Sequence, residues 1–253
     1  MVQPRCPDPG VAALGATGPG TDILQAQPAK WAEGWCSGCR QGNIFYPVFD
    51  LVDGASPATF DGQLGFALGS IHLYNQAGRQ LPPTSFDGFA TYQLPAGLAR
   101  YRLVTATTTW DFTSSRPATD QTPDGTVCVG TGNGTSTAPC QADPLVFLRY
   151  DAGLSLNNTV TPGTHQIRVS GYHQDPAAPA VTSLKLWTST DGGRTWQPAQ
   201  VTGGRDGMFT AVYTVPASGT NGHVSIKAQA SDATGNDITQ TLSNAYGIAT
   251  AAG

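Results

Sequence analysis

Short stretches in which apolar and polar residues alternate recur along most of the chain, with Gly, Pro, Asn or Asp between them. The segment 101–107 (Tyr-Arg-Leu-Val-Thr-Ala-Thr) is an example, because its aromatic and β-branched residues are typical of a strand. The pattern predicts strands of 7–11 residues separated by turns. Those expected before residue 154 cover 43–52, 65–75, 86–94, 99–109 and 144–150. Those expected after it cover 165–172, 181–189, 195–201, 208–215, 224–230 and 237–246.

This spacing predicts an all-β protein made of two consecutive β-sandwich domains. The first, residues 31–153, is expected to be jelly-roll-like. The second, residues 154–248, has the size and strand count of an immunoglobulin-like or fibronectin-like domain without a core disulfide. Residues 1–30 are rich in Pro, Gly and Ala and resemble a linker, while residues 249–253 are expected to form a frayed tail.

Residues 189–196 (Ser-Thr-Asp-Gly-Gly-Arg-Thr-Trp) match the pattern S-x-D-x-G-x-T-W, which is known as an Asp-box. The pattern predicts a tight hairpin turn built by Ser189, Asp191 and Gly193, with Trp196 laid across the hairpin. Asp-boxes recur once per blade in sialidase propellers, but a propeller needs several copies and this sequence has one. We therefore interpret the motif as a structural turn.

The composition agrees with strands and tight turns. The 253 residues include 31 Gly and 19 Pro, and only 12% are charged. The formal net charge is −4, without the basic surface that nucleic-acid binding requires, so we expect no nucleic-acid partner. The longest apolar runs are about five residues, so no membrane span is expected. No apolar signal region follows Met1, which heads either a cytosolic protein or a fragment.

Five cysteines favour an exported fragment. Cys128 and Cys140 bracket an eleven-residue Gly/Thr/Ser-rich loop, which a disulfide would stabilise by about 3 kcal/mol. We predict this disulfide, and with it a secreted, extracellular protein. Cys36 and Cys39 form a C-x-x-C, which we interpret as a local disulfide or a pair of structural thiols. Half a zinc site or a redox pair are its alternatives, but a zinc ribbon needs a second C-x-x-C or a His pair nearby. Cys6 is left without a partner.

Other candidate chemistry is sparse, and we predict no catalytic residue, no metal ligand and no cofactor. Residues 134–139 partly resemble a serine-peptidase nucleophile motif around Ser136, but the base and the orienting acid are missing. The histidines lack metal-ligand spacing: His72, His165, His173 and His223. Structural calcium is the remaining metal alternative, with oxygens from Asp50, Asp53, Asp61, Asp87, Asp175, Asp206, Asp232 and Asp237. Candidates for sugar stacking are Trp31, Trp35 and Trp110, although core packing is the favoured interpretation.

Several segments resemble a known family. Residues 35–47 (Trp-Cys-Ser-Gly-Cys-Arg-Gln-Gly-Asn-Ile-Phe-Tyr-Pro), 99–110, 145–150, 224–236 and 245–247 are similar to the region that follows the catalytic domain in large secreted subtilisin-like serine peptidases of bacteria. The family's catalytic Asp, His and Ser motifs have no match here. The resemblance therefore implies a non-catalytic carboxy-terminal region.

The expected function is that of an accessory region of an exported serine peptidase, which stabilises the catalytic domain or binds substrate or surface material. Its expected partners are an upstream peptidase domain or a protein or polysaccharide surface. The alternatives are a carbohydrate-binding or adhesive module, or a self-assembling surface or filament subunit. The sequence leaves the oligomeric state open.

Overall fold

In the part of the chain that the structure describes, nearly all regular secondary structure is β-strand, as predicted. The computed structural model describes residues 30–31, 36, 38–50, 71–86, 89–154 and 157–249. Within these residues the one α-helix is α2 (Val129–Gly132). Residues 1–29 of the predicted linker, Cys6 among them, and residues 250–253 of the predicted tail lie outside the described residues. The last linker residue, Lys30, belongs to a strand.

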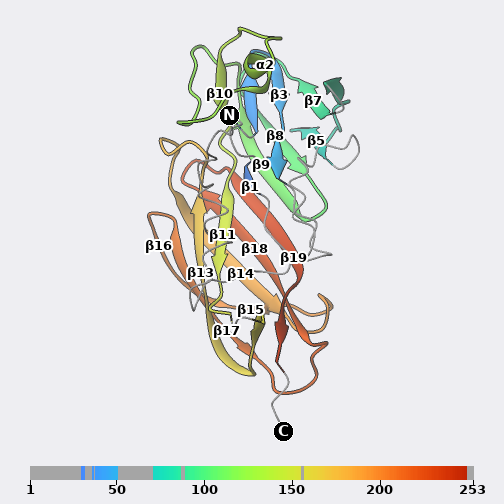
Figure 1. Cartoon of the computed structure of the whole chain (residues 1–253), viewed down its shortest axis with the longest axis vertical. Coiled ribbons are helices and arrows are strands. Elements are labelled where there is room, and N and C mark those ends of the chain that lie inside the picture. The colour runs from blue at the N-terminus through green and yellow to red at the C-terminus, as the bar shows by residue number, and fades with distance from the viewer. Residues whose placement is uncertain are drawn as a thin grey trace, which may run out of the picture.

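The largest element is an eight-stranded sheet that runs along the molecule (Figure 1). Its strand order is β15-β14-β18-β19-β9-β8-β5, and β12 pairs with β19 in parallel. The bounds are β5 (His72–Asn75), β8 (Ala99–Val104), β9 (Thr108–Ser114), β12 (Thr159–Val160), β14 (Val181–Ser189), β15 (Gln197–Pro198), β18 (His223–Asp232) and β19 (Asp237–Ile248).

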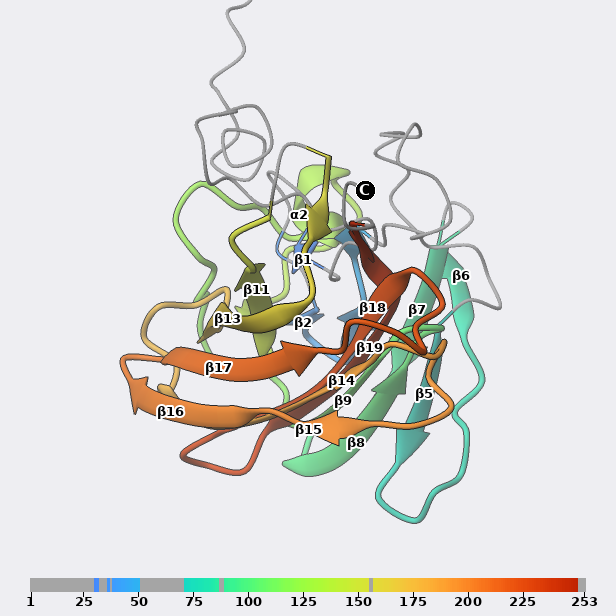
Figure 2. The ribbon, with the colours of Figure 1, turned by 90° about the horizontal axis from the view of Figure 1, so that it is seen from below.

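Two smaller sheets pack on one face of the long sheet and complete a sandwich-type fold (Figures 1 and 2). One has the order β11 (Phe147–Asp151), β13 (Gly163–Tyr172), β17 (Met208–Val215), β16 (Gln200–Arg205). The other has the order β10 (Cys140–Ala142), β2 (Cys39–Gln41), β3 (Ile44–Tyr46), β7 (Phe89–Gln93), β6 (Thr84–Phe86). A two-stranded ladder joins β1 (Lys30–Trp31) to β4 (Phe49–Asp50).

The alternation of the sequence decides which side chains enter the core. In β9, Trp110 and Phe112 are fully buried, whereas Asp111 between them lies on the outer face. Phe112 packs against Phe45 of β3, with 5.4 Å between ring centroids, and so ties the five-stranded sheet to the long one. At the other end Tyr246 of β19 donates a 2.7 Å hydrogen bond to the hydroxyl of Tyr213 in β17.

The two expected sandwiches are not separate sheets. β9, from the first expected domain, pairs with β19 from the second, with Trp110 opposite Ile238. In addition, β11 lies before the expected 153/154 boundary but pairs with β13 after it. The hydrophobic core is correspondingly continuous across that boundary. Strand edges explain the difference, because each half would otherwise leave unpaired N–H and C=O groups at an edge that the other half covers.

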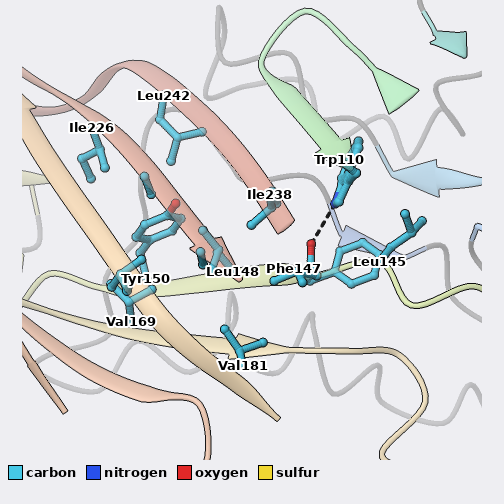
Figure 3. Close-up of a cluster of buried hydrophobic side chains, with 14 of the residues drawn as sticks. Trp110, Leu145, Phe147, Leu148, Tyr150, Val169, Val181, Ile226, Ile238 and Leu242 are labelled. Carbon is cyan, nitrogen blue, oxygen red and sulfur yellow. Dashed lines mark hydrogen bonds between the residues drawn. The ribbon is translucent and has the colours of Figure 1, made fainter. Parts of the chain in front are cut away.

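A buried junction joins the halves (Figure 3). The indole N–H of Trp110 donates a 2.7 Å hydrogen bond to the carbonyl oxygen of Val146, and its ring centroid lies 6.2 Å from that of Phe147. Beside it, buried Gln240 donates to the Thr108 hydroxyl at 3.0 Å and accepts from the Tyr150 hydroxyl at 3.0 Å. These bonds cross from β9 and β19 to β11, so the junction is specified by side chains as well as by strand pairing.

Strand boundaries differ from the prediction in several places. The strand expected at 99–109 ends at Val104, and a separate strand, β9, begins at Thr108. The strand expected at 195–201 is divided between β15 and β16. The strand expected at 65–75 is described only from residue 71 onward, where it forms β5. The Gly-rich excursion 114–143 contains α2 and β10, and β10 adds an edge strand to β2.

Candidate functional site

The Asp-box forms a turn held by the Asp191 carboxylate. Oδ1 accepts hydrogen bonds from the Ser189 hydroxyl at 2.8 Å and the Thr195 N–H at 3.0 Å, while Oδ2 accepts from the Thr195 hydroxyl at 2.7 Å. These hydrogen bonds, first of all those from Thr195, hold the pKa of Asp191 well below its usual range. Gly193 has φ of 84°, and its N–H donates to the Ser189 hydroxyl oxygen at 2.9 Å. Asp191 therefore acts within its own turn.

The turn places Trp196 on the outer face of the long sheet. There the ammonium of Lys227 lies 4.8 Å from the ring centroid of Trp196 and 5.1 Å from that of Trp187. The two half-buried indoles thus bracket one side chain in a double cation–π contact. Sequence reasoning missed this bracket, because Lys227 lies thirty-one residues after Trp196 and meets it only through the pairing of β14 with β18.

Polar side chains cover the rest of this outer face in rows across the strands. One row follows the paired positions Lys185, Gln229, Thr239, Thr109, Val104 and His72. The next row follows Ser183, Ser231, Asp237, Asp111, Arg102 and Tyr74. Apart from Val104, the face is thus a surface of polar and charged groups with aromatic rings toward both ends.

An open groove of about 540 Å³ lies on this face over β5, β8 and β9. It is lined by Tyr74, Gln76 and Arg102, among others. The Arg102 guanidinium makes a two-pronged contact with Asp111, at 3.0 Å from Nε to Oδ1 and 2.9 Å from Nη2 to Oδ2. The hydrogen bonds and charge of Asp111 raise the pKa of Arg102. Both ends of the pair are fixed, so the groove presents oriented donors and acceptors beside one aromatic ring.

A second shallow hollow of about 250 Å³ continues the face over β14, β18 and β19. Lys185, Gln229 and Thr239 line it. The two hollows adjoin because Asp237, which lines the second, lies opposite Asp111, which lines the first, where β19 pairs with β9. We call the two hollows together the outer-face groove.

The cysteines lie at the far end of the molecule, in a buried cluster. Disulfides join Cys36 to Cys39 and Cys128 to Cys140, the pairs that the sequence spacing indicated. All four are at most 3% exposed and form one core cluster with Ala142. The sequence did not indicate that the two pairs share a core, because Cys39 and Cys128 are 89 positions apart.

An adjacent buried polar group connects β2, the end of β9 and the segment that follows β7. The Arg40 guanidinium is fully buried and donates to the Ser114 hydroxyl at 3.0 Å and to the carbonyl oxygens of Leu94 and Pro95 at 3.2 and 2.6 Å. Burial raises the pKa of Asp143 nearby to about 8, although a hydrogen bond with Ser114 and the charge of Arg40 oppose the rise. Arg40 was not singled out by sequence reasoning, which has no signal for a buried arginine on a strand.

The remaining candidate residues have local structural partners. His173 is buried, with Nδ1 2.9 Å from the Leu145 carbonyl and Nε2 3.5 Å from Asp232, and desolvation lowers its pKa. Asp232 in turn accepts hydrogen bonds from Thr234 and Asn236, which organise a turn. The Ser136 hydroxyl oxygen accepts the Ala138 N–H at 3.2 Å.

Among the described residues, the other candidate histidines and aspartates do not meet at a shared site. His72 contacts Gln80, and His165 contacts the Thr161 carbonyl. Among the described residues, the group of three or more potential metal ligands that meets in space is Cys36, Cys39 and Cys128. Asp237 forms an ion pair with Arg100, and the Asp175 carboxylate accepts a hydrogen bond from the Ala177 N–H within its own turn. Asp53, Asp61, Asp87 and the side chains of Asp50, Trp31 and Trp35 lie outside the described residues, while Trp110 is a core residue.

Comparisons with known proteins name no family. No protein-family profile and no curated protein matches the chain. Among solved structures, a DUF4785 family protein from Legionella pneumophila is 9% identical with a TM-score of 0.37, and the match covers 72% of this chain and 51% of that one. The sulfane dehydrogenase SoxCD from Paracoccus pantotrophus is 12% identical (TM-score 0.25; 70% of this chain, 51% of that one), and titin is 11% identical (TM-score 0.24; 88% and 100%). The chain spans about half the length of the first two structures.

No helix in the described parts of the chain combines the length and apolarity needed to cross a membrane.

Proposed function

We propose that this chain is a non-catalytic accessory region of an exported serine peptidase and that it holds extended substrate or surface polymer on the outer-face groove. The observation that carries the binding role is the groove itself. It is a solvent-facing sheet surface on which rows of oriented polar side chains lie between Tyr74 and the bracket of Trp187, Trp196 and Lys227.

The exported, accessory part of the proposal is supported by other features. The segment around Cys36 and Cys39 carries the resemblance to the secreted peptidases, and two disulfides are typical of oxidising compartments. The continuous sheet from β15 to β5 and the Trp110 junction favour one stiff body, which suits a part that positions a neighbouring domain.

Binding to the groove can be tested with two polymers of different class. Reduced, unfolded casein and insoluble polysaccharides are incubated with the purified chain, and the bound fraction is measured by co-sedimentation. We expect binding to at least one polymer, and at least a tenfold loss for the double variant Lys185→Ala/Arg102→Ala. Arg149→Ala serves as the control, because Arg149 is an exposed arginine on β11, in the other layer. Unchanged binding by the double variant, or no binding to either polymer, contradicts the role of the groove.

The accessory role has a separate test. The coding sequence upstream of Val2 should contain an in-frame subtilisin-like domain, and the chain alone should neither cleave casein nor react with a serine-hydrolase probe. Labelling at Ser136 would contradict the non-catalytic assignment.

A carbohydrate-binding or adhesive module is the second candidate, favoured by the exposed parts of Tyr74, Trp187 and Trp196 beside hydroxyl and amide groups. Binding to a polysaccharide but not to casein, lost in Tyr74→Ala, would favour it over a substrate-holding role.

A further inference from the structure

The four-cysteine cluster (Cys36, Cys39, Cys128 and Cys140) brings two distant segments to one buried point. The sulfur atoms of Cys36, Cys39 and Cys128 all lie within 4.8 Å of one another, and Cys140 is bonded to Cys128. All four side chains are buried, and Ala142 completes the cluster. The second cysteine pair that a zinc-binding C-x-x-C requires is therefore present, supplied by the fold instead of by the neighbouring sequence.

Backbone hydrogen bonds hold the two segments together independently of the sulfur atoms. The Cys36 N–H donates to the Val127 carbonyl at 3.0 Å, and the Asp143 N–H donates to the Gly38 carbonyl at 3.1 Å. The ladder between β10 and β2 places Ala142 opposite Cys39. The backbone therefore holds the two cysteine segments next to each other.

The chain turns within the first pair and then forms a hairpin. Gly38 has φ of 60°, which lets the chain turn between Cys36 and Cys39, and β2 and β3 form a hairpin directly afterwards. A disulfide that closes a loop as short as Cys36–Cys39 restricts the unfolded chain less than one that closes a long loop. Loop closure by itself therefore gives this disulfide only a small stabilising effect. A shared metal ion gives a reason for both pairs to occupy one core.

We propose that the reduced four-cysteine cluster binds one zinc ion as a tetrathiolate centre, of which the two disulfides are the oxidised form. Zinc–sulfur bonds of about 2.3 Å place the sulfur atoms of a tetrahedral site roughly 3.8 Å apart. Reduction must therefore separate the bonded sulfur atoms within each pair, whereas the two pairs are already close, because the sulfur atoms of Cys36, Cys39 and Cys128 lie within 4.8 Å of one another. Four soft thiolates with no carboxylate or imidazole favour zinc over calcium or magnesium. This inference does not depend on the outer-face groove.

The interconversion balances with a dithiol reductant and a disulfide-forming oxidant. Two dithiols reduce the two protein disulfides, delivering four electrons and four protons, and are themselves oxidised to disulfides. Zinc then replaces the four thiol protons. Removal of four electrons from the four bound thiolates restores both protein disulfides and releases the metal ion.

The test uses the whole chain, reduced with a phosphine under argon and then given zinc or cobalt. We expect one zinc ion per chain by elemental analysis, and with cobalt the thiolate-to-metal charge-transfer and d–d absorption of a tetrahedral site. The oxidised chain should bind none. Far-ultraviolet circular dichroism of the reduced zinc form should match that of the oxidised protein, because the strands are the same.

Variants separate this site from other thiol chemistry. Cys140→Ser should weaken zinc binding at least a hundredfold, whereas Cys6→Ser, which removes the fifth thiol, should leave one zinc ion per chain. Cys36→His keeps a zinc ligand but abolishes a disulfide, so it should still bind zinc and remain folded when reduced. The proposal is overturned if the reduced wild-type chain binds no metal or fails to fold with zinc. It is equally overturned if Cys140→Ser binds as tightly as the wild type, or if Cys36→His loses both zinc and fold.

Discussion

The indole N–H of Trp110 and the carbonyl oxygen of Val146 form a buried 2.7 Å hydrogen bond between the two halves of the protein. Val146 directly precedes β11, the strand that the first half contributes to the sheet of the second. The bond therefore fixes the point at which the chain passes from one layer to the other. A side chain of this size with a single polar atom suits the position, because it fills the core and satisfies a carbonyl that no strand pairs.

Replacing Trp110 should destabilise the whole protein. Trp110→Phe keeps an aromatic ring but leaves the Val146 carbonyl without this donor, and we expect a loss of about 1–3 kcal/mol in the free energy of unfolding. Trp110→Ala also opens a cavity and should cost about 3–5 kcal/mol. Denaturant unfolding measures both, with Leu98→Ala as control, since Leu98 is 74% exposed and its removal should change stability by less than about 0.5 kcal/mol. A separate transition for each half, with only one shifted by Trp110→Phe, would contradict a shared core.

Asp143 should make the protein less stable as the pH rises. Its folded pKa of about 8 is above the ordinary value, so the folded state binds a proton more tightly than the unfolded state does. The stabilisation is full below pH about 4, the unfolded pKa, and is lost as the pH rises towards 8. Asp143→Asn, which is neutral throughout, should flatten this slope. Urea midpoints between pH 5 and 9 measure it; an equal slope in the variant and the wild type would show that another group is responsible.

Local patterns in the sequence were sufficient for most strands and the Asp-box turn. Alternation identified β14 and β17, and the hydrogen bonds of Asp191 lie within eight consecutive residues. It did not identify β9 as a strand of its own, because the strand expected at 99–109 covers β8, the following turn and the first two residues of β9. The all-β class followed from the same patterns.

Contacts between distant segments could not be read in this way. The pairing of β9 with β19, the Lys227 bracket and the meeting of the two cysteine pairs all depend on which strand edges find each other. Each strand is compatible with several partners, and one sequence alone does not say which pairing leaves fewest edges exposed.

Gly207 should be intolerant of a side chain. It has φ of 73°, and a Cβ atom there would collide with the backbone carbonyl oxygen of Gly171, whose own N–H donates to the Gly207 carbonyl at 2.8 Å. Gly207→Ala should therefore lower stability by more than the roughly 1 kcal/mol that a left-handed alanine costs. Gly219→Ala is the matched control, because Gly219 has φ of 76° with open space around its Cβ position. Thermal unfolding compares the two; equal losses would mean that the turn adjusts to remove the collision.

Acidification should loosen the Asp-box before it unfolds the core. The pKa of Asp191 is held below its ordinary value by hydrogen bonds from Thr195 and Ser189, so its carboxylate stabilises the turn above pH about 4. That stabilisation is lost as the pH falls through the lower folded pKa. Because the turn positions Trp196 against Lys227, tryptophan fluorescence should report the change. We expect Asp191→Asn to show at neutral pH the emission that the wild type reaches only in strong acid, while Asp206→Asn, in another surface turn, should behave as the wild type. Identical acid profiles for Asp191→Asn and the wild type would show that the carboxylate does not hold the bracket.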